Sequence, residues 1–262
     1  RSTSPSRTPC RVRSPATMGR LTERQDGYGR AMWDYHHDRG GYEICERDDG
    51  LCVPSPGPVN YFAGYTDWPD VEKKAVRLAR GKVLDVGCGA GRVCLHLQRK
   101  GLDVTGVDVS PLAVRVCRLR GVKQARVLSV TQLTRKLGIF DTLVFFGNNF
   151  GLFGSFKRAR WLLRRFYHMT GERGRIIAES RDPYQTDRPE HLAYHRRSRK
   201  RGRMGGQLRL RIRYLTHATP WFDYLLVSQA EMKKICRGTG WHVARFIDSN
   251  GSLYVGVLEK DD

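Results

Sequence analysis

The sequence lacks a long hydrophobic run, a Cys-x-x-Cys pair and enough acidic residues to balance its basic ones. A membrane-spanning helix needs about 20 mostly apolar residues, and no stretch of this chain approaches that length. Without paired cysteines the usual zinc spacing is missing, so we expect no metal site. The seven cysteines are an odd number, which argues against a complete disulfide framework. We therefore expect a soluble protein of the reducing cytoplasm that makes no use of a membrane.

Acidic residues are scarce relative to basic ones. The chain has 47 Lys and Arg against 26 Asp and Glu, which gives a net charge of +21. A positive field of this size attracts polyanions such as nucleic acid, and also small acidic metabolites. A solvated basic surface accounts for the same numbers. The net charge alone is therefore compatible with a nucleic-acid partner but does not require one.

The chain divides into three parts by composition. Residues 1–17 are rich in Ser, Pro and Arg and lack the apolar segment of a secretory signal, so we expect either a disordered tail or sequence upstream of a start at Met18. Residues 18–80 are rich in aromatic side chains, and we expect a helical cap that includes a helix from Val71 to Arg80. Residues 81–262 then form the core, with an inserted element at 181–224.

Strand and helix patterns alternate from Lys82 onward. The pattern predicts strands at 82–86, 102–109, 125–130, 140–146 and 174–180, and helices at 91–101, 110–121 and 156–171. Ser110 and Pro111 provide a helix cap and a first helical residue. A further helix at 228–240 precedes two strands at 241–249 and 252–260, joined by an Asn-Gly turn. This order predicts an α/β fold with a mostly parallel, doubly wound sheet and an antiparallel strand pair at its end.

The inserted element at 181–224 departs from this alternation of strands and helices. Residues 195–203 read "HRRSRKRGR", and residues 208–214 alternate apolar side chains with arginines, which predicts a half-buried strand. Residues 221–227 could pair with that strand as a hairpin. Because the element leaves from the end of the sheet where ligands bind in such folds, we expect it to lie above the site as a basic lid.

A glycine ladder follows the first core strand in "KVLDVGCGAGR", from Lys82 to Arg92. Such a turn lets a ligand approach bare backbone at the N-terminus of a helix. A phosphate-binding loop would need a lysine that is absent here. A dinucleotide fingerprint would need a third glycine where Arg92 stands. The ladder therefore indicates a ligand other than a nucleoside triphosphate or a dinucleotide.

The segments "VLDVGCGAGR" and "VTGVDVSP" resemble the first two motifs of class I S-adenosylmethionine-dependent methyltransferases. The resemblance covers residues 80–180 and 228–260. It implies a seven-stranded Rossmann-like sheet, an enzyme of the methyltransferase class, S-adenosylmethionine as cofactor and S-adenosylhomocysteine as product. It also implies that Asp85 serves the cationic amino-acid end of the cofactor and that Asp108 accepts both ribose hydroxyls.

The resemblance places the cofactor among a defined set of residues. These are Asp85, Gly87, Cys88, Gly89, Gly91, Asp108, Val109, Ser129, Gly147 and Tyr65. The acid that often faces the adenine amino group after the third strand is absent, so Ser129 or backbone groups would have to take its place. Tyr65, together with Tyr61, either covers the cofactor as a lid or packs in the core.

The acceptor is expected near "GNNFGLFG", residues 147–154, at the end of the fourth strand. This stretch resembles the "GNSF" of glycine-type small-molecule N-methyltransferases. Asn148 and Asn149 either hold the acceptor or satisfy backbone groups of a tight loop. His36 is a candidate base, or a surface residue, and Glu179 is a further candidate.

These patterns predict methyl transfer to a small-molecule acceptor that bears an amine or an anionic group. An RNA methyltransferase that uses the basic insertion is the first alternative. A cofactor-binding protein without activity is the second.

Overall fold

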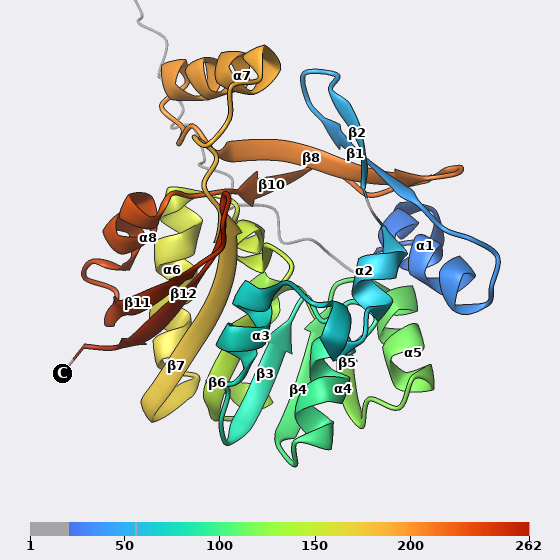
Figure 1. The fold of residues 1–262 in the computed structure, drawn as a ribbon, viewed down its shortest axis with the longest axis vertical. Helices are drawn as coiled ribbons and strands as arrows, with labels where there is room; N and C mark the ends of the chain where they lie inside the picture. The colour runs from blue at the N-terminus through green and yellow to red at the C-terminus, as the bar shows by residue number, and fades with distance from the viewer. Residues whose placement is uncertain (1–20, 56, 262) are drawn as a thin grey trace, which may run out of the picture.

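The computed structural model describes residues 21–55 and 57–261. A seven-stranded sheet with helices on both faces forms the larger part of the molecule, and a five-stranded sheet lies across one end of it (Figure 1). None of the helices in these two ranges is long and apolar enough to cross a membrane.

The seven-stranded sheet has the strand order β11-β12-β7-β6-β3-β4-β5. Its strands are β3 (Lys82–Val86), β4 (Asp103–Asp108), β5 (Gln124–Val127), β6 (Phe140–Phe145), β7 (Thr170–Arg181), β11 (Trp241–Asp248) and β12 (Leu253–Lys260). β3 to β7 run parallel, whereas β12 is antiparallel to β7 and to β11. This arrangement confirms the predicted α/β fold and its antiparallel final pair.

Successive apolar side chains along the strands belong to opposite faces of this sheet, so each face has its own hydrophobic core. Leu84 and Leu143 belong to one hydrophobic cluster, whereas their neighbours Val83 and Val144 belong to another. The first cluster includes buried residues of α6 (Phe156–Tyr167) and α8 (Gln229–Cys236). The second includes residues of α3 (Asp70–Val76), α4 (Arg92–Arg99) and α5 (Pro111–Leu119). Successive side chains of a strand point to opposite faces, so both faces must be covered by helices.

Local signals account for most of these helix boundaries. The Ser110 hydroxyl accepts a hydrogen bond from the Ala113 N–H at 2.9 Å, and Pro111 opens α5 as predicted. Ser228 and Glu231 form the capping box of α8. The predicted end of α3 at Arg80 is wrong, because the helix ends at Val76. Its last turn tightens, with the Leu78 N–H bonded to the Ala75 carbonyl, before the chain enters β3.

The second sheet joins two distant parts of the chain in the order β10-β8-β1-β2, with β9 paired to β8. Its strands are β1 (Glu43–Arg47), β2 (Cys52–Ser55), β8 (Gln207–Tyr214), β9 (His217–Ala218) and β10 (Phe222–Leu225). The predicted pairing of residues 208–214 with 221–227 is confirmed as β8 with β10. The hairpin of β1 and β2 was not predicted, and it pairs with β8 through β1.

Helices and short turns complete the molecule around the second sheet. They are α1 (Gly27–His36), α2 (Pro58–Phe62), α7 (Pro189–Lys200) and the 3-10 helices η1 (Glu23–Gln25), η2 (Tyr65–Asp67), η3 (Val130–Gln132), η4 (Arg135–Leu137) and η5 (Asn149–Phe153). α7 lies on the side of the second sheet that faces away from the seven-stranded sheet (Figure 1). The insertion is therefore a helix followed by three strands, whereas the sequence predicted only the two paired strands.

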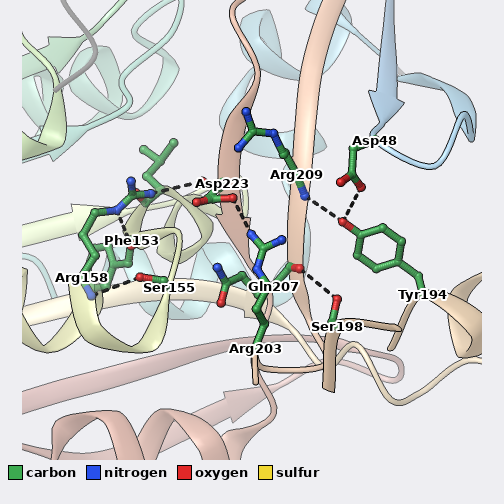
Figure 2. A network of polar contacts seen from close by, with 11 residues as sticks. Asp48, Phe153, Ser155, Arg158, Tyr194, Ser198, Arg203, Gln207, Arg209 and Asp223 are labelled. Carbon is green, nitrogen blue, oxygen red and sulfur yellow. Dashed lines mark hydrogen bonds and ion pairs between the residues drawn. The ribbon is translucent and has the colours of Figure 1, made fainter. Parts of the chain in front are cut away.

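A network of polar contacts fixes the insertion to the rest of the molecule (Figure 2). The Tyr194 hydroxyl donates to Asp48 at 2.7 Å and accepts from the Arg209 N–H at 3.1 Å, which ties α7 to the β1–β2 turn and to β8. The Asp223 side chain accepts from Arg203, and its carbonyl accepts from Arg158 of α6. The second sheet is thus anchored to both the N-terminal segment and the larger sheet.

Candidate functional site

The glycine ladder lies between the end of β3 and the start of α4. Gly87, Gly89 and Gly91 have φ values of +75°, +52° and +81°, a backbone region that favours glycine. A Cβ at Gly87 would lie 2.4 Å from the Asn149 amide nitrogen, and one at Gly91 would lie 2.7 Å from the Cys117 sulfur. The first and third glycines are therefore required by both conformation and space. At Gly89 a Cβ would meet only ordinary contacts, the nearest at 3.5 Å.

Asp108 ends β4 and connects the two sequence motifs. One oxygen of its carboxylate accepts the Gly89 N–H at 3.0 Å, and the other accepts the Ser110 N–H at 2.9 Å. Burial raises the pKa of Asp108 to about 6, although both backbone hydrogen bonds lower it. Each carboxylate oxygen can accept a second donor, so the side chain retains capacity for a ligand.

Asp85 lies beneath the ladder near the end of β3. Its carboxylate is 2% exposed and accepts a hydrogen bond from the Cys94 thiol at 3.2 Å. Burial raises the pKa of Asp85 to about 7, so near neutral pH it holds a proton part of the time. Asp85 and Asp108 thus lie at the same edge of the sheet, as their strand ends predict.

The loop after β6 is held by a buried carboxylate of β7. Glu179 accepts the Gly147 N–H at 3.1 Å and the Asn148 N–H at 2.9 Å, one with each oxygen. Burial, and then the nearby Glu72 carboxyl, raise the pKa of Glu179 well above its usual range. Gly147 and Asn148 both have positive φ values, +71° and +61°. Glu179 therefore stabilises a loop conformation that few residues adopt.

The two adjacent asparagines have different surroundings. The Asn149 amide donates to the carbonyls of Val86 and Gly87 at 2.9 and 3.0 Å, which ties this loop to the ladder. The Asn148 side-chain oxygen is buried and has no hydrogen-bond partner within residues 21–55 and 57–261. The Asn148 backbone carbonyl accepts from the Tyr224 hydroxyl of β10 at 2.6 Å. The loop thus joins the ladder on one side and the second sheet on the other.

Three of the remaining predicted residues lie near this edge of the sheet. The Cys88 side chain points into the core, 4.0 Å from the Cys117 sulfur, so the ladder offers only its backbone at this position. Ser129 caps η3, where its hydroxyl accepts from the Thr131 N–H at 3.4 Å. Val109 follows Asp108 and is partly buried.

Tyr65 and His36 are not brought together with the other predicted residues. The Tyr65 ring stacks on His96 of α4 at a centroid distance of 4.3 Å, and its hydroxyl accepts from Arg77. His36, at the end of α1, stacks on Phe62 of α2 at 6.1 Å. Burial, followed by the neighbouring His37, lowers the pKa of His36. Both rings contact helices rather than the loop that contains the asparagines.

Two residues received no role in the prediction: Tyr28 lies beside Gly89, and Glu43 is linked to Tyr28 through Tyr61. The Tyr28 hydroxyl is the atom that lies 3.5 Å from the Cβ position of Gly89. The ring of Tyr28 packs edge-on against Tyr61 at 5.1 Å, and the Tyr61 hydroxyl donates to Glu43. Only the spacing of buried residues in α1 and β1 could have indicated them, and that spacing does not show what a side chain faces. Within residues 21–55 and 57–261, no cluster of three or more His, Cys, Asp or Glu side chains could hold a metal.

Comparison with known proteins agrees with this geometry. Residues 83–174 match the family described as "Methyltransferase domain". The chain is 40% identical over 72 residues to a ubiquinone biosynthesis O-methyltransferase of Xanthomonas oryzae pv. oryzae. The aligned region covers 25% of this chain and 30% of the relative. The chain thus spans about a third of the length of the curated relatives that it matches first.

Two solved structures share the fold. One is an S-adenosylmethionine-dependent methyltransferase from Bacteroides fragilis in complex with S-adenosyl-L-homocysteine, with a TM-score of 0.80, 24% identity and coverage of 93% of this chain and 98% of that one. The other is from Methanosarcina mazei, with a TM-score of 0.56, 15% identity and coverage of 74% and 97%. The family match confirms a methyltransferase domain over residues 83–174, and the two solved structures confirm the predicted fold.

Proposed function

We propose that this chain transfers the methyl group of S-adenosylmethionine to a small-molecule acceptor and releases S-adenosylhomocysteine. The observation that carries the proposal is the contact between the two motifs. Asp108 receives the N–H of the middle glycine of the ladder, Gly89, so the acid is held directly against the backbone of the ladder.

The residues present suit this cofactor. The free acceptor capacity of Asp108 matches a ribose diol, and Asp85 lies on the side where the cationic amino-acid end would be held. The Tyr28 hydroxyl and the Met32 side chain lie 3.5–3.8 Å from the Cβ position of Gly89, so they border the proposed cofactor position. The cofactor supplies a methyl group on a positively charged sulfur, which is displaced in line by a lone pair of the acceptor. This chain would contribute alignment and exclusion of water.

The acceptor is proposed to lie against the loop after β6. The buried Asn148 side-chain oxygen has no partner, so an N–H or O–H group of an acceptor could satisfy it. Asn149 is instead engaged with two backbone carbonyls, which assigns it to loop structure. The match over 72 residues to ubiquinone biosynthesis O-methyltransferases supports a small acceptor rather than a polymer.

The test is to incubate the protein with methyl-labelled S-adenosylmethionine and cell extract, and then to separate RNA, protein and small molecules. We expect label in the small-molecule fraction. Label in RNA would favour the alternative in which the exposed basic side chains of α7 bind a polyanion. Cofactor binding without any transfer would favour a protein that has no catalytic activity.

A further inference from the structure

A buried carboxylate above the glycine ladder has one oxygen without a partner. Glu43 begins β1 and is 1% exposed. Its Oε1 accepts hydrogen bonds from the Tyr61 hydroxyl at 2.6 Å and from the Ser55 hydroxyl at 3.0 Å. Its Oε2 is buried and accepts none from the residues that the structure describes. Buried carboxylates are costly unless both oxygens are satisfied, so this one requires an explanation.

Glu46 of this strand and Asp49 of its turn are paired with arginines, whereas Asp48 accepts the Tyr194 hydroxyl. Glu46 accepts from Arg211 at 2.8 Å and from Arg213 at 3.1 Å, and Asp49 is paired with Arg47 at 2.8 Å. In the described parts of the chain, the side-chain donors to Glu43 are the Tyr61 and Ser55 hydroxyls, and no Lys, Arg or His forms an ion pair with it. A chain with a net charge of +21 thus leaves its most buried β1 carboxylate without a positive partner.

Two tyrosines connect Glu43 to the ladder. The Tyr61 hydroxyl donates to Glu43, and the Tyr61 ring packs against Tyr28 at an interplanar angle of 60°. The Tyr28 hydroxyl in turn lies 3.5 Å from the Cβ position of Gly89. Glu43 is therefore separated by two aromatic side chains from the backbone where the cofactor is proposed to lie. Aromatic rings next to a carboxylate are also suited to a cationic ligand.

We propose that Glu43 binds the amino group of the acceptor, so that the substrate is a small molecule bearing a protonated amine. The free Oε2 accepts an N–H of that group, and the ammonium supplies the positive charge that the described residues do not. This inference rests on the proposed methyl transfer, and it narrows the acceptor from small molecules in general to amines. Tyr61 and Ser55 act as positioning residues, because they orient the carboxylate through Oε1.

The test compares Glu43→Gln with Glu46→Gln, a matched removal of a carboxylate from the same strand. Each protein is supplied with methyl-labelled S-adenosylmethionine and a cell extract freed of protein and nucleic acid, and the products are separated by cation exchange at low pH. We expect labelled products of the wild type to be retained as cations. Glu43→Gln should lower the yield at least about tenfold through a higher KM, because a charged hydrogen bond is lost. Glu46→Gln should behave as the wild type.

Two further measurements separate the outcomes. Glu43→Gln should bind S-adenosylmethionine within about twofold of the wild type, and its melting temperature should be equal or higher because an uncompensated buried charge is removed. Neutral or anionic products, an unchanged yield, a large loss of cofactor affinity or a marked fall in melting temperature in Glu43→Gln would each overturn the assignment. If the wild type does not bind the cofactor, or binds it and labels nothing, the proposed methyl transfer itself fails.

Discussion

The two sheets differ in how their contacts are distributed along the chain. The parallel part of the seven-stranded sheet comes from residues 82–181, a stretch that includes the region of the family match. The second sheet pairs Ile44 with Arg213 and Cys45 with Ile212, so each half depends on a segment far away in the sequence. We propose that the first sheet provides the cofactor edge and that the second contributes Tyr224 and Glu43 on the acceptor side. The division suggests that cofactor and acceptor binding can be altered separately.

The largest effect is expected from Gly87→Val. A Cβ there would lie 2.4 Å from the Asn149 amide nitrogen, at a φ of +75°. We expect affinity for S-adenosylmethionine, measured by calorimetry, to fall by about 100-fold or more, because strain of a few kcal/mol distorts the ladder. Gly101→Ala is the control: its φ is +81°, but a Cβ there meets nothing within 4 Å. Equal loss in both variants would show that the effect is general destabilisation.

Asp108→Asn should have the next largest effect. The amide cannot accept as many hydrogen bonds as the carboxylate and has no charge, so we expect a loss of about 1.5–3 kcal/mol in cofactor binding, roughly 10-fold to 100-fold. Asp103→Asn, at the exposed start of the same strand, should bind normally. Unchanged affinity in Asp108→Asn would separate this carboxylate from the cofactor.

The affinity for the cofactor should also depend on pH. Because burial raises the pKa of Asp108 to about 6, the side chain becomes protonated as the pH falls through that value and loses acceptor capacity. Below about pH 6 the dissociation constant should rise by up to about tenfold per pH unit. For the ligand-free protein the sign is opposite, since a raised carboxylate pKa favours folding at low pH and this contribution is lost as the pH rises through about 6. Calorimetric titrations from pH 5 to 8 check the first trend, and a flat profile would contradict it.

Tyr224→Phe tests the second sheet with a smaller change. It removes the hydroxyl that donates to the Asn148 carbonyl at 2.6 Å, a hydrogen bond worth about 1 kcal/mol. We expect kcat/KM for transfer to fall roughly fivefold while cofactor affinity stays the same. A variant that loses cofactor affinity instead would mean that the two sheets do not act separately.

The smallest effect is expected on the outer face of α7. Arg196 and Lys200 are exposed and belong to the basic helix that stands away from the larger sheet (Figure 1). Replacing both by alanine should leave cofactor affinity and transfer to small molecules unchanged, measured with labelled cofactor. A large drop that disappears at high salt would indicate a polyanionic acceptor instead.

The larger sheet was predictable because its signals are local. Buried strands such as β3 and β6 are short apolar runs, and Ser110 and Ser228 mark helix starts by their own hydrogen bonds. The β1–β2 hairpin was missed because its strands are short, with β1 mostly half-buried and β2 mostly exposed, and because β1 is stabilised by β8 from the insertion. α7 was missed because its basic sequence has little apolar periodicity.

The residues of the candidate site that lie at the ends of strands could be predicted from the sequence. Asp85 and Asp108 follow from the two motifs, but the difference between Asn148 and Asn149 does not. It depends on the carbonyls of Val86 and Gly87, which lie more than 60 residues earlier in the chain. No sequence motif pointed to Glu43, because the residues that bond to it lie in α2 and β2 and are brought near it only by tertiary packing.

Binding of S-adenosylmethionine at the ladder is the central claim, and calorimetry of the wild-type protein tests it most directly. We predict binding at a single site, displacement by S-adenosylhomocysteine and no competition from NAD. Absence of binding, or tight binding of NAD in competition with S-adenosylmethionine, would contradict the account.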